Sequence, residues 1–262
     1  MRSRYGVELN LVHHGRGPVR AVLVHGLASN ALLWDGVAES LAEMGLPSVA
    51  VDLRGHGQSD RPDTGYDMAT VADEVADVVL AVSDRPVVLV GQSWGGNVVV
   101  ECAARNPRVA ESVVGVDGGL IRLADDFADR GAAWEVLAPP RFDGMKLEML
   151  EPMIRSRLAG WPATAMTGAL ANFEEDGDGF VKARLSRDRH RLILEGLFEH
   201  DPGAALARVS VPILMLLTSQ SAQRLDDRHR LARGVRIEVV DADHDVHAQY
   251  PDLVAGLIAE MT

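Results

Sequence analysis

The stretch VVLVGQSWGGNVVV, residues 87–100, interrupts an apolar run with a serine that stands between glycines. Its first part belongs to PVVLV (86–90), a short continuous apolar run typical of a strand buried on both faces. Its second part begins WGGNVVVECAARNP (94–107), which has the spacing of a helix that ends at Asn-Pro. The residues between them therefore predict a tight strand-to-helix turn, with the Ser93 hydroxyl raised above the sheet.

The glycines around this serine indicate why the turn is possible. A Cβ at Gly91 or Gly95 would collide with the neighbouring strand or helix, so only small residues permit the turn. The start of the helix directs free N–H groups toward the serine, which favours negative charge that develops there. The pattern G-x-S-x-G in this context predicts a nucleophile elbow, with Ser93 as the nucleophile.

Strand-like and helix-like patterns alternate on both sides of the turn. We expect strands at 7–14, 20–26, 47–51, 86–90, 109–119, 211–219 and 235–245, and helices at 32–45, 68–82, 94–107, 222–233 and 251–261. This alternation predicts βαβ units and an α/β fold with a mostly parallel, doubly wound sheet. Residues 120–200 show helical patterns without a convincing strand. We therefore expect a core of residues 1–119 and 201–262, and a helical cap at 120–200 inserted after the sixth strand.

Four segments in a fixed order give the chain a family resemblance. They are His25-Gly26, DLRGHGQSD (52–60), GQSWGG (91–96) and the late histidine His244. With these segments the chain resembles an α/β-hydrolase of the serine hydrolase or esterase type with a helical cap. The resemblance covers about two thirds of the chain, and four ordered segments are far more specific than a lone G-x-S-x-G.

Serine needs a base to act at neutral pH, and the resemblance implies a histidine. His244 lies in DADHDVH, just past the last apolar strand, where the family has its catalytic histidine. His247 is the alternative, and otherwise we expect a partly exposed loop histidine there. The resemblance implies structural roles for His25 and His56. The other five are expected at the surface, namely His13, His14, His190, His200 and His229.

The third member of the triad should be a carboxylate that orients the histidine. The family commonly has it after the strand that matches VPILMLLTS (211–219), but no acid follows there before Asp226 and Asp227. Asp117 ends the strand after the elbow helix, and some α/β-hydrolases have the acid at that place. The order Ser93, Asp117, His244 fits the family. Asp226 is the alternative acid, and a dyad without an acid is a third possibility.

The resemblance also implies an oxyanion hole, formed by the backbone N–H groups of Leu27 and Trp94. The cap contains Trp134, Trp161 and a run of methionines at 145, 149 and 153, which we expect to divide between core packing and an apolar pocket. The acidic run at 174–179 departs from a calcium loop at its last ligand position, so a solvated loop is expected there.

Composition excludes several classes of partner. The net charge of −12 disfavours nucleic acid and anionic membrane surfaces. The single cysteine, Cys102, cannot form an intramolecular disulfide or a cysteine metal cluster, and we expect it to be a small buried side chain. MRSRYGVELN is too polar for a signal peptide, and no apolar run approaches the ~18–20 residues of a membrane span. We expect a cytoplasmic protein, either monomer or homodimer, with no cofactor and no metal.

The sequence therefore predicts a serine hydrolase, most commonly a carboxylesterase, that acts on a small and mainly apolar ester. Carbon–carbon bond hydrolases, perhydrolases, lactonases and thioesterases use the same residues and stay open as alternatives. Serine at position 93 disfavours dehalogenases and epoxide hydrolases, which need a carboxylate nucleophile. A ligand-binding relative with little turnover is the alternative from another class.

Overall fold

Seven strands form one central sheet in the computed structural model, which describes residues 1–142, 144–225 and 235–262. In spatial order they are β1 (Leu11–His14), β3 (Ser48–Val51), β2 (Ala21–Val24), β4 (Val87–Gln92), β5 (Ala110–Val116), β8 (Ile213–Thr218) and β9 (Val235–Val240). The edge strand β1 is antiparallel to β3, and the other five pairs are parallel. This mostly parallel sheet confirms the expected fold class.

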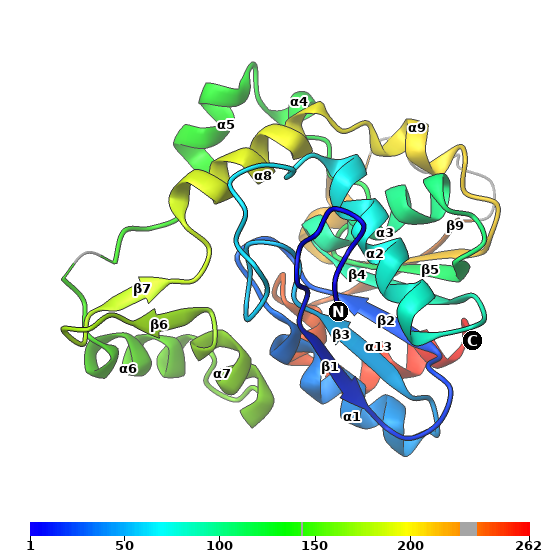
Figure 1. Ribbon diagram of the computed structural model, residues 1–262, viewed down its shortest axis with the longest axis horizontal. Coiled ribbons are helices and arrows are strands. Elements are labelled where there is room, and N and C mark those ends of the chain that lie inside the picture. The colour runs from blue at the N-terminus through cyan, green and yellow to red at the C-terminus, as the bar shows by residue number, and fades with distance from the viewer. Residues whose placement is uncertain (143, 226–234) are drawn as a thin grey trace.

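Helices cover both faces of the sheet. Figure 1 shows α2 (Met68–Val82) and α3 (Trp94–Arg105) on one face, and α1 (Asp35–Glu43) and α13 (Pro251–Ala259) on the other. Successive residues of β4 alternate between the two layers. Val87 and Leu89 pack in the cluster that contains α2 and α3, whereas Val88 and Val90 pack in the cluster that contains α1 and α13. Because both faces are buried, the strand reads as an unbroken apolar run.

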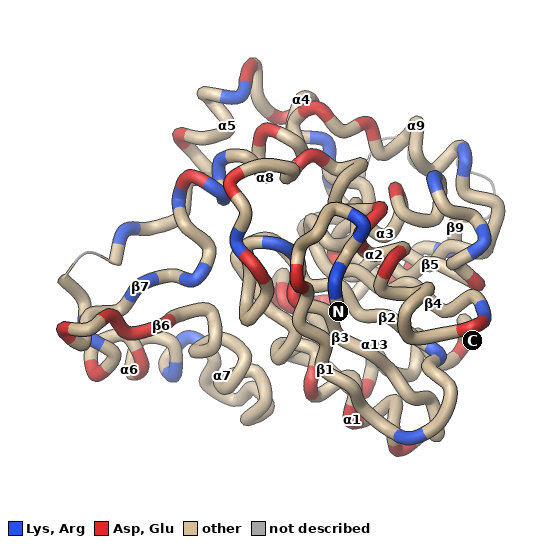
Figure 2. Tube along the Cα trace, in the orientation of Figure 1, with Lys and Arg blue, Asp and Glu red and all other residues tan. Residues whose placement is uncertain are grey.

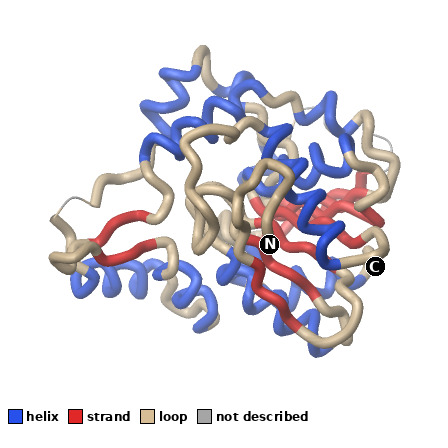
Figure 3. The backbone as a smooth tube through the Cα atoms, in the orientation of Figure 1, coloured by secondary structure: helices blue, strands red, loops and turns tan. Residues whose placement is uncertain are grey.

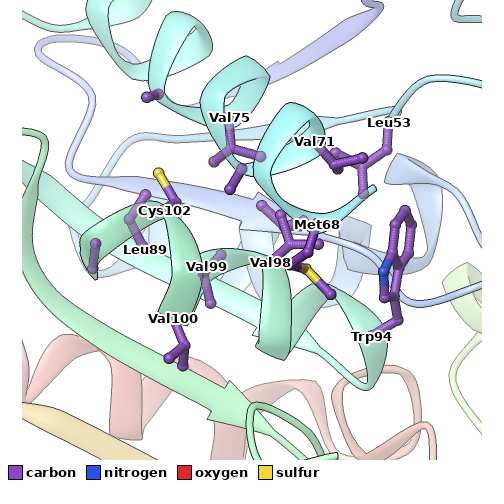
Figure 4. Close-up of a cluster of buried hydrophobic side chains, with 14 of the residues drawn as sticks. Leu53, Met68, Val71, Val75, Leu89, Trp94, Val98, Val99, Val100 and Cys102 are labelled. Carbon is purple, nitrogen blue, oxygen red and sulfur yellow. The ribbon is translucent and has the colours of Figure 1, made fainter. Parts of the chain in front are cut away.

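The helix that follows β4 is held firmly against its neighbours. Figure 4 shows Val71 and Val75 of α2 facing Val98 and Cys102 of α3 across the same cluster. Cys102 is fully buried, as expected, and its burial raises the pKa of the thiol well above the ordinary value. Close packing of this kind gives the first turn of α3 a fixed position relative to the sheet.

Shorter helical segments complete the core. They are η1 (Ala31–Trp34), α9 (Pro202–Leu206), α10 (Ser219–Gln223) and α12 (Val246–Gln249). The helix expected at 222–233 is described only in part, because α10 ends at Gln223 and residues 226–234 lie outside the described residues. In the part of the chain that is described, no helix is both long enough and apolar enough to cross a membrane.

Residues 120–200, referred to below as the cap, lie between β5 and β8. Its elements are α4 (Leu123–Asp126), α5 (Arg130–Leu137), α6 (Leu147–Arg157), α7 (Ala163–Leu170), β6 (Phe173–Glu175), β7 (Val181–Ala183) and α8 (Arg187–Glu199). The cap follows the fifth strand of the chain, so the expectation of a sixth strand before it was wrong. Residues 1–10, before β1, contain an isolated bridge between Arg2 and Glu8 and add no strand to the sheet.

The cap also contains strands that its sequence pattern did not predict. β6 and β7 form an antiparallel hairpin separate from the main sheet (Figure 3). Asp176 closes the hairpin, because its Oδ1 accepts the backbone N–H groups of Asp178 and Phe180. Figure 2 shows acidic residues along β6, and one of them, Glu174, forms a double hydrogen bond with Arg61 of the core. The acidic run thus comprises the end of β6, which Glu174 anchors to the core, and a mostly exposed turn at 176–179, so the expected solvated loop is confirmed for the turn only.

Candidate active site

The turn between β4 and α3 places Ser93 at the start of the helix. Ser93 has φ 53° and ψ −123°, a backbone conformation that residues with a Cβ rarely adopt. A Cβ at Gly91 would lie 2.1 Å from the carbonyl oxygen of Gly95, and one at Gly95 would lie 2.4 Å from that of His25. Gly91 and Gly95 carry no side chain that would push β4, α3 and the end of β2 apart. Ser93 can therefore keep its strained backbone conformation.

Asp117 directly follows β5 and is fixed by β8. Its backbone N–H donates to the carbonyl of Leu216 at 2.7 Å, and its Oδ1 accepts the N–H of Thr218 at 2.8 Å. The residue is 4% exposed and has φ 44°. Two bonds thus hold Asp117 against β8. The acid expected after this same strand, Asp226, lies outside the described residues.

His244 lies in the loop between β9 and α12, and it meets Asp117. Its Nδ1 is 2.5 Å from Asp117 Oδ2, which is a charge-assisted hydrogen-bond distance. The backbone carbonyl of His244 accepts the side-chain N–H of Gln92 at 3.2 Å, so the residue next to Ser93 holds the histidine loop. The His244 side chain is 55% exposed, whereas that of Asp117 is 2% exposed. A buried carboxylate therefore anchors an imidazole that is open to solvent.

The two partners shift one another's protonation. Burial by itself would raise the pKa of Asp117, but hydrogen bonds from His244, Thr218 and Ser221 outweigh burial and lower that pKa. Partial burial likewise acts to lower the pKa of His244, and the hydrogen bond and negative charge of Asp117 reverse this and raise it. The carboxylate thus favours the protonated form of the imidazole.

A cavity of about 980 Å³ connects these residues. Ser93, Asp117 and His244 line it together, with Leu27 and Trp94 beside them. The cap supplies much of the remaining wall through Leu123, Phe127, Leu137, Trp161, His190 and Leu194. The structure therefore brings all five residues that the sequence singled out to one cavity under the cap. The exposed methionines of α6, Met149 and Met153, do not line it.

The amides of Leu27 and Trp94 both lie at this cavity. Trp94 is the first residue of α3, where a helix leaves its N–H groups without partners. No hydrogen bond within the described residues uses the N–H of Leu27 or of Trp94. A Cβ at Gly26 would approach the Ser93 Cβ to 3.1 Å, so the loop after β2 runs close beside the serine. Two backbone donors are thus free next to the hydroxyl.

Two buried histidines support that loop. His25 accepts the N–H of Leu53 on Nε2 at 3.0 Å, and its Nδ1 contacts the carbonyl of Gly26 at 2.7 Å. His56 accepts the N–H of Ala28 on Nε2 at 3.3 Å. Burial lowers the pKa of both rings, so they stay neutral and can accept these bonds. The loop after β2 is therefore held by neutral imidazoles.

Three other histidines lie deeper than expected. His247, expected in a partly exposed loop, is fully buried and its ring lies 4.3 Å from that of Trp34. His190 and His200, expected at the surface, are 6% and 9% exposed. Each belongs to a helix or helix end whose buried face is set by contacts with distant segments. His247 does not line the cavity, and His229 lies outside the described residues.

Residues that the sequence did not single out also shape the site. Thr218 and Gln92 fix Asp117 and His244, and the buried Asn97 bonds the segment after Asp117. Gln92 belongs to the elbow motif, which could have drawn attention to it. Thr218 acts through its backbone, which leaves no side-chain pattern. Within the described residues, no three or more His, Cys, Asp or Glu side chains are grouped to hold a metal ion.

Known proteins match the chain over most of its length. A family model for the alpha/beta hydrolase family matches residues 21–257. The 2-(acetamidomethylene)succinate hydrolase of Mesorhizobium japonicum is 28% identical over 257 residues, which cover 96% of this chain and 90% of that protein. A crystal structure of E-2-(acetamidomethylene)succinate hydrolase has a TM-score of 0.80 at 25% identity, and covers 100% of this chain and 97% of its own.

A more distant solved structure has the same fold. The enol-lactonase from Burkholderia xenovorans has a TM-score of 0.71 at 19% identity, with 98% of this chain and 96% of that chain covered. The matched region of the family model begins at the first residue of β2 and ends within the last helix, α13. The chain belongs to the alpha/beta hydrolase family.

Proposed function

We propose that the protein is a serine hydrolase that cleaves an ester-type bond in a small, mainly apolar substrate. The observation that carries the proposal is the 2.5 Å contact between His244 Nδ1 and Asp117 Oδ2, beside a cavity that Ser93 also lines. A hydroxyl, an imidazole and a buried carboxylate in this chain order are the set that activates serine for attack on a carbonyl.

In the proposed acylation, the Ser93 oxygen forms a bond to the carbonyl carbon and its proton passes to Nε2 of His244. Asp117 accepts a hydrogen bond from the Nδ1–H of His244, so the proton stays on Nδ1 and Nε2 is free to accept the serine proton. The carboxylate also stabilises the imidazolium that forms. The carbonyl oxygen becomes an oxyanion bound by the amides of Leu27 and Trp94. Each such donor contributes about 2.7–4 kcal/mol to the transition state. His244 then gives its proton to the leaving alkoxide as the carbon–oxygen bond breaks.

Deacylation repeats these steps with water. His244 removes a proton from a water molecule as the water oxygen bonds to the acyl carbon. The bond to the Ser93 oxygen breaks, and that oxygen takes the proton from His244. The acid product leaves, and the enzyme returns to its starting protonation. No group outside these residues is needed for the balance of atoms or charge.

The cavity supports an apolar substrate of modest size. Aromatic and aliphatic side chains of the cap form much of its wall, including Phe127, Leu137, Trp161 and Leu194. Apolar walls that carry some polar groups are the usual composition of a small-molecule site. The same residues would serve a carbon–carbon bond hydrolase, a lactonase or a thioesterase, so the bond that is cleaved is the finer part of the proposal.

The 28% identical relative is a hydrolase of 2-(acetamidomethylene)succinate, a substrate with carboxylate groups. The cavity of this chain is lined by Arg122, Arg157 and Arg224, but also by Asp125, Asp126, Asp243 and Asp245. The charges of its wall are thus mixed. A substrate panel should therefore contain neutral esters together with carboxylate-bearing esters and amides.

Labelling with a fluorophosphonate probe tests the nucleophile. We expect the wild type to be labelled at Ser93 and Ser93→Ala to be unlabelled. Ser219→Ala, which removes a serine whose hydroxyl donates to the carbonyl of Val240 and does not line the cavity, should keep the label. Equal labelling of the wild type and Ser93→Ala would refute the proposal.

Turnover of p-nitrophenyl esters of increasing acyl length tests the reaction, with a lactone and a thioester beside them. We expect hydrolysis of short to medium esters, and its loss in Ser93→Ala. A ligand-binding relative would instead be stabilised by a ligand while it hydrolyses none of these compounds.

A further inference from the structure

Asn97 is a fully buried amide on α3, one helical turn after Ser93. Its Oδ1 accepts the backbone N–H groups of Gly119 at 3.1 Å and Ile121 at 3.2 Å. Its Nδ2 donates to the carbonyl of Ile121 at 2.7 Å and lies 3.2 Å from Nδ1 of His200. An amide has two N–H groups and two acceptor positions, so every one of them has a partner here.

Three of these four partner groups belong to the segment that leaves Asp117 and enters the cap. This segment, residues 118–121, begins with two glycines, and Gly119 has φ 91°. Glycine has wide backbone freedom, so the local sequence does little to determine the path of the chain here. A Cβ at Gly118 would lie 2.1 Å from the carbonyl oxygen of Ser93, which shows how closely the segment passes the serine. The bonds from Asn97 supply the constraint that the glycines lack.

The fourth partner lies at the other end of the cap. His200 follows α8, and its Nδ1 faces Asn97 while its Nε2 lies 3.4 Å from Glu101 of α3. A second contact joins the same two chain segments, since Arg122 lies 3.7 Å from Asp201. Both ends of the cap therefore meet at α3, and Asn97 contacts both.

We propose that Asn97 is a positioning residue, which fixes residues 118–121 and thereby Asp117 and the first wall residues of the cavity against the helix that begins at Ser93. This inference rests on the proposed function, because it acts through Asp117 and the cavity. Without the amide, the N–H groups of Gly119 and Ile121 lose their acceptor, and the segment must move to find another. A displacement of about 1 Å at a catalytic group can reduce the rate about 10²-fold.

Three variants test the inference. Asn97→Ala removes all four bonds, and Asn97→Asp keeps an acceptor for Gly119 and Ile121 while it loses both donors. Val99→Ala is the matched control, because Val99 is fully buried on the same helix and packs in the apolar cluster of Figure 4. The His244 ring is titrated by NMR in each protein, with His244→Gln used for assignment. The kinetic constants kcat and KM and the melting temperature are measured in parallel.

We expect the pKa of His244 to fall in Asn97→Ala, because its bond to Asp117 weakens, and to fall less in Asn97→Asp. We expect kcat/KM to drop at least about tenfold in Asn97→Ala, with changes in both kcat and KM. Val99→Ala should lower the melting temperature but leave the His244 titration and both kinetic constants near the wild type.

A wild-type His244 titration in Asn97→Ala would overturn the inference, and so would equal losses in Val99→Ala. If Asn97→Ala does not fold, Asn97→Asp carries the test through the same titration. The titration does not depend on turnover. A protein that hydrolyses no ester would therefore refute the proposed function and still reveal whether Asn97 positions the Asp117–His244 pair.

Discussion

Asp117 and His244 are separated by 127 positions in the chain, yet Asp117 Oδ2 lies 2.5 Å from His244 Nδ1. The strand where the family more commonly has its acid, β8, here supplies the N–H of Thr218, which donates to the other oxygen of Asp117 at 2.8 Å. One strand thus carries the carboxylate, and its neighbour orients it. The lack of an acid directly after β8 is therefore compatible with a complete set of site residues.

The first prediction concerns Asp117→Asn. We expect kcat to fall by about 10⁴-fold, because the amide favours the wrong tautomer of His244 and cannot stabilise its charged form. The folded structure should persist, since the amide can still accept the N–H of Thr218. Ester hydrolysis and thermal melting are the measurements.

Asp126→Asn is the matched control for this variant. Asp126 lines the same cavity but, within the described residues, forms no hydrogen bond or ion pair with His244, so its amide should change kcat by much less. A small effect of Asp117→Asn, or an equal effect of both variants, would show that Asp117 does not orient the base.

The second prediction concerns the pH profile. His244 must be neutral to accept a proton, so activity is lost as pH falls through its pKa. Because Asp117 raises that pKa above the ordinary 6.5, the acid limb of kcat/KM should lie at higher pH than for an isolated histidine. In Asp117→Asn the residual activity should have its acid limb at lower pH. A limb at the same pH in both proteins would contradict this account.

The third prediction concerns the strain at Ser93. Glycine tolerates φ 53° and ψ −123°. The free energy of unfolding of Ser93→Gly should therefore be about 1 kcal/mol larger than that of the wild type, and its melting temperature about 2–4 °C higher. Activity should be abolished. Ser93→Ala is the control, since it removes the hydroxyl but keeps the Cβ, and we expect no comparable gain in stability. Equal stabilisation of both variants would assign the gain to the hydroxyl instead of the backbone.

The fourth prediction concerns His247. Burial lowers its pKa from 6.5 to about 4, so the unfolded chain binds a proton that the folded protein does not. Stability should be full above pH 6.5 and should decline as pH falls from 6.5 toward 4, with a loss on the order of 3 kcal/mol.

Urea unfolding between pH 8 and pH 4 measures this loss. His247→Leu should make the decline smaller by about this amount, because leucine does not titrate and has a similar volume, whereas the part that comes from the buried His25, His56 and His190 should remain. His13→Gln, which changes an exposed histidine, should follow the wild-type curve. If His247→Leu also follows that curve, the acid sensitivity arises elsewhere.

Local chemistry made much of this protein predictable. The elbow needs small residues at fixed spacing, and strands buried on both faces need unbroken apolar runs. The chain order of the site residues in the family indicates where the acid and the histidine should follow. The limits are equally physical. The burial of His190, His200 and His247 depends on which distant segments pack against each helix. The residues around a histidine in the sequence do not indicate which segments these are. The β6–β7 hairpin depends on Asp176 and on Arg61 of the core, so its short strands carry little signal of their own.

By itself, the sequence determined the alternation of strands and helices, the strained turn at Ser93 and the residue types that can do acyl chemistry, because those properties depend on neighbours within a few positions. Only the tertiary structure decided which carboxylate faces His244, which cap residues line the cavity, and which segments Asn97 holds together. Those relationships join atoms from strands and loops that are far apart in the chain. Their distances are set by the packing of helices on the sheet, which no short stretch of residues encodes.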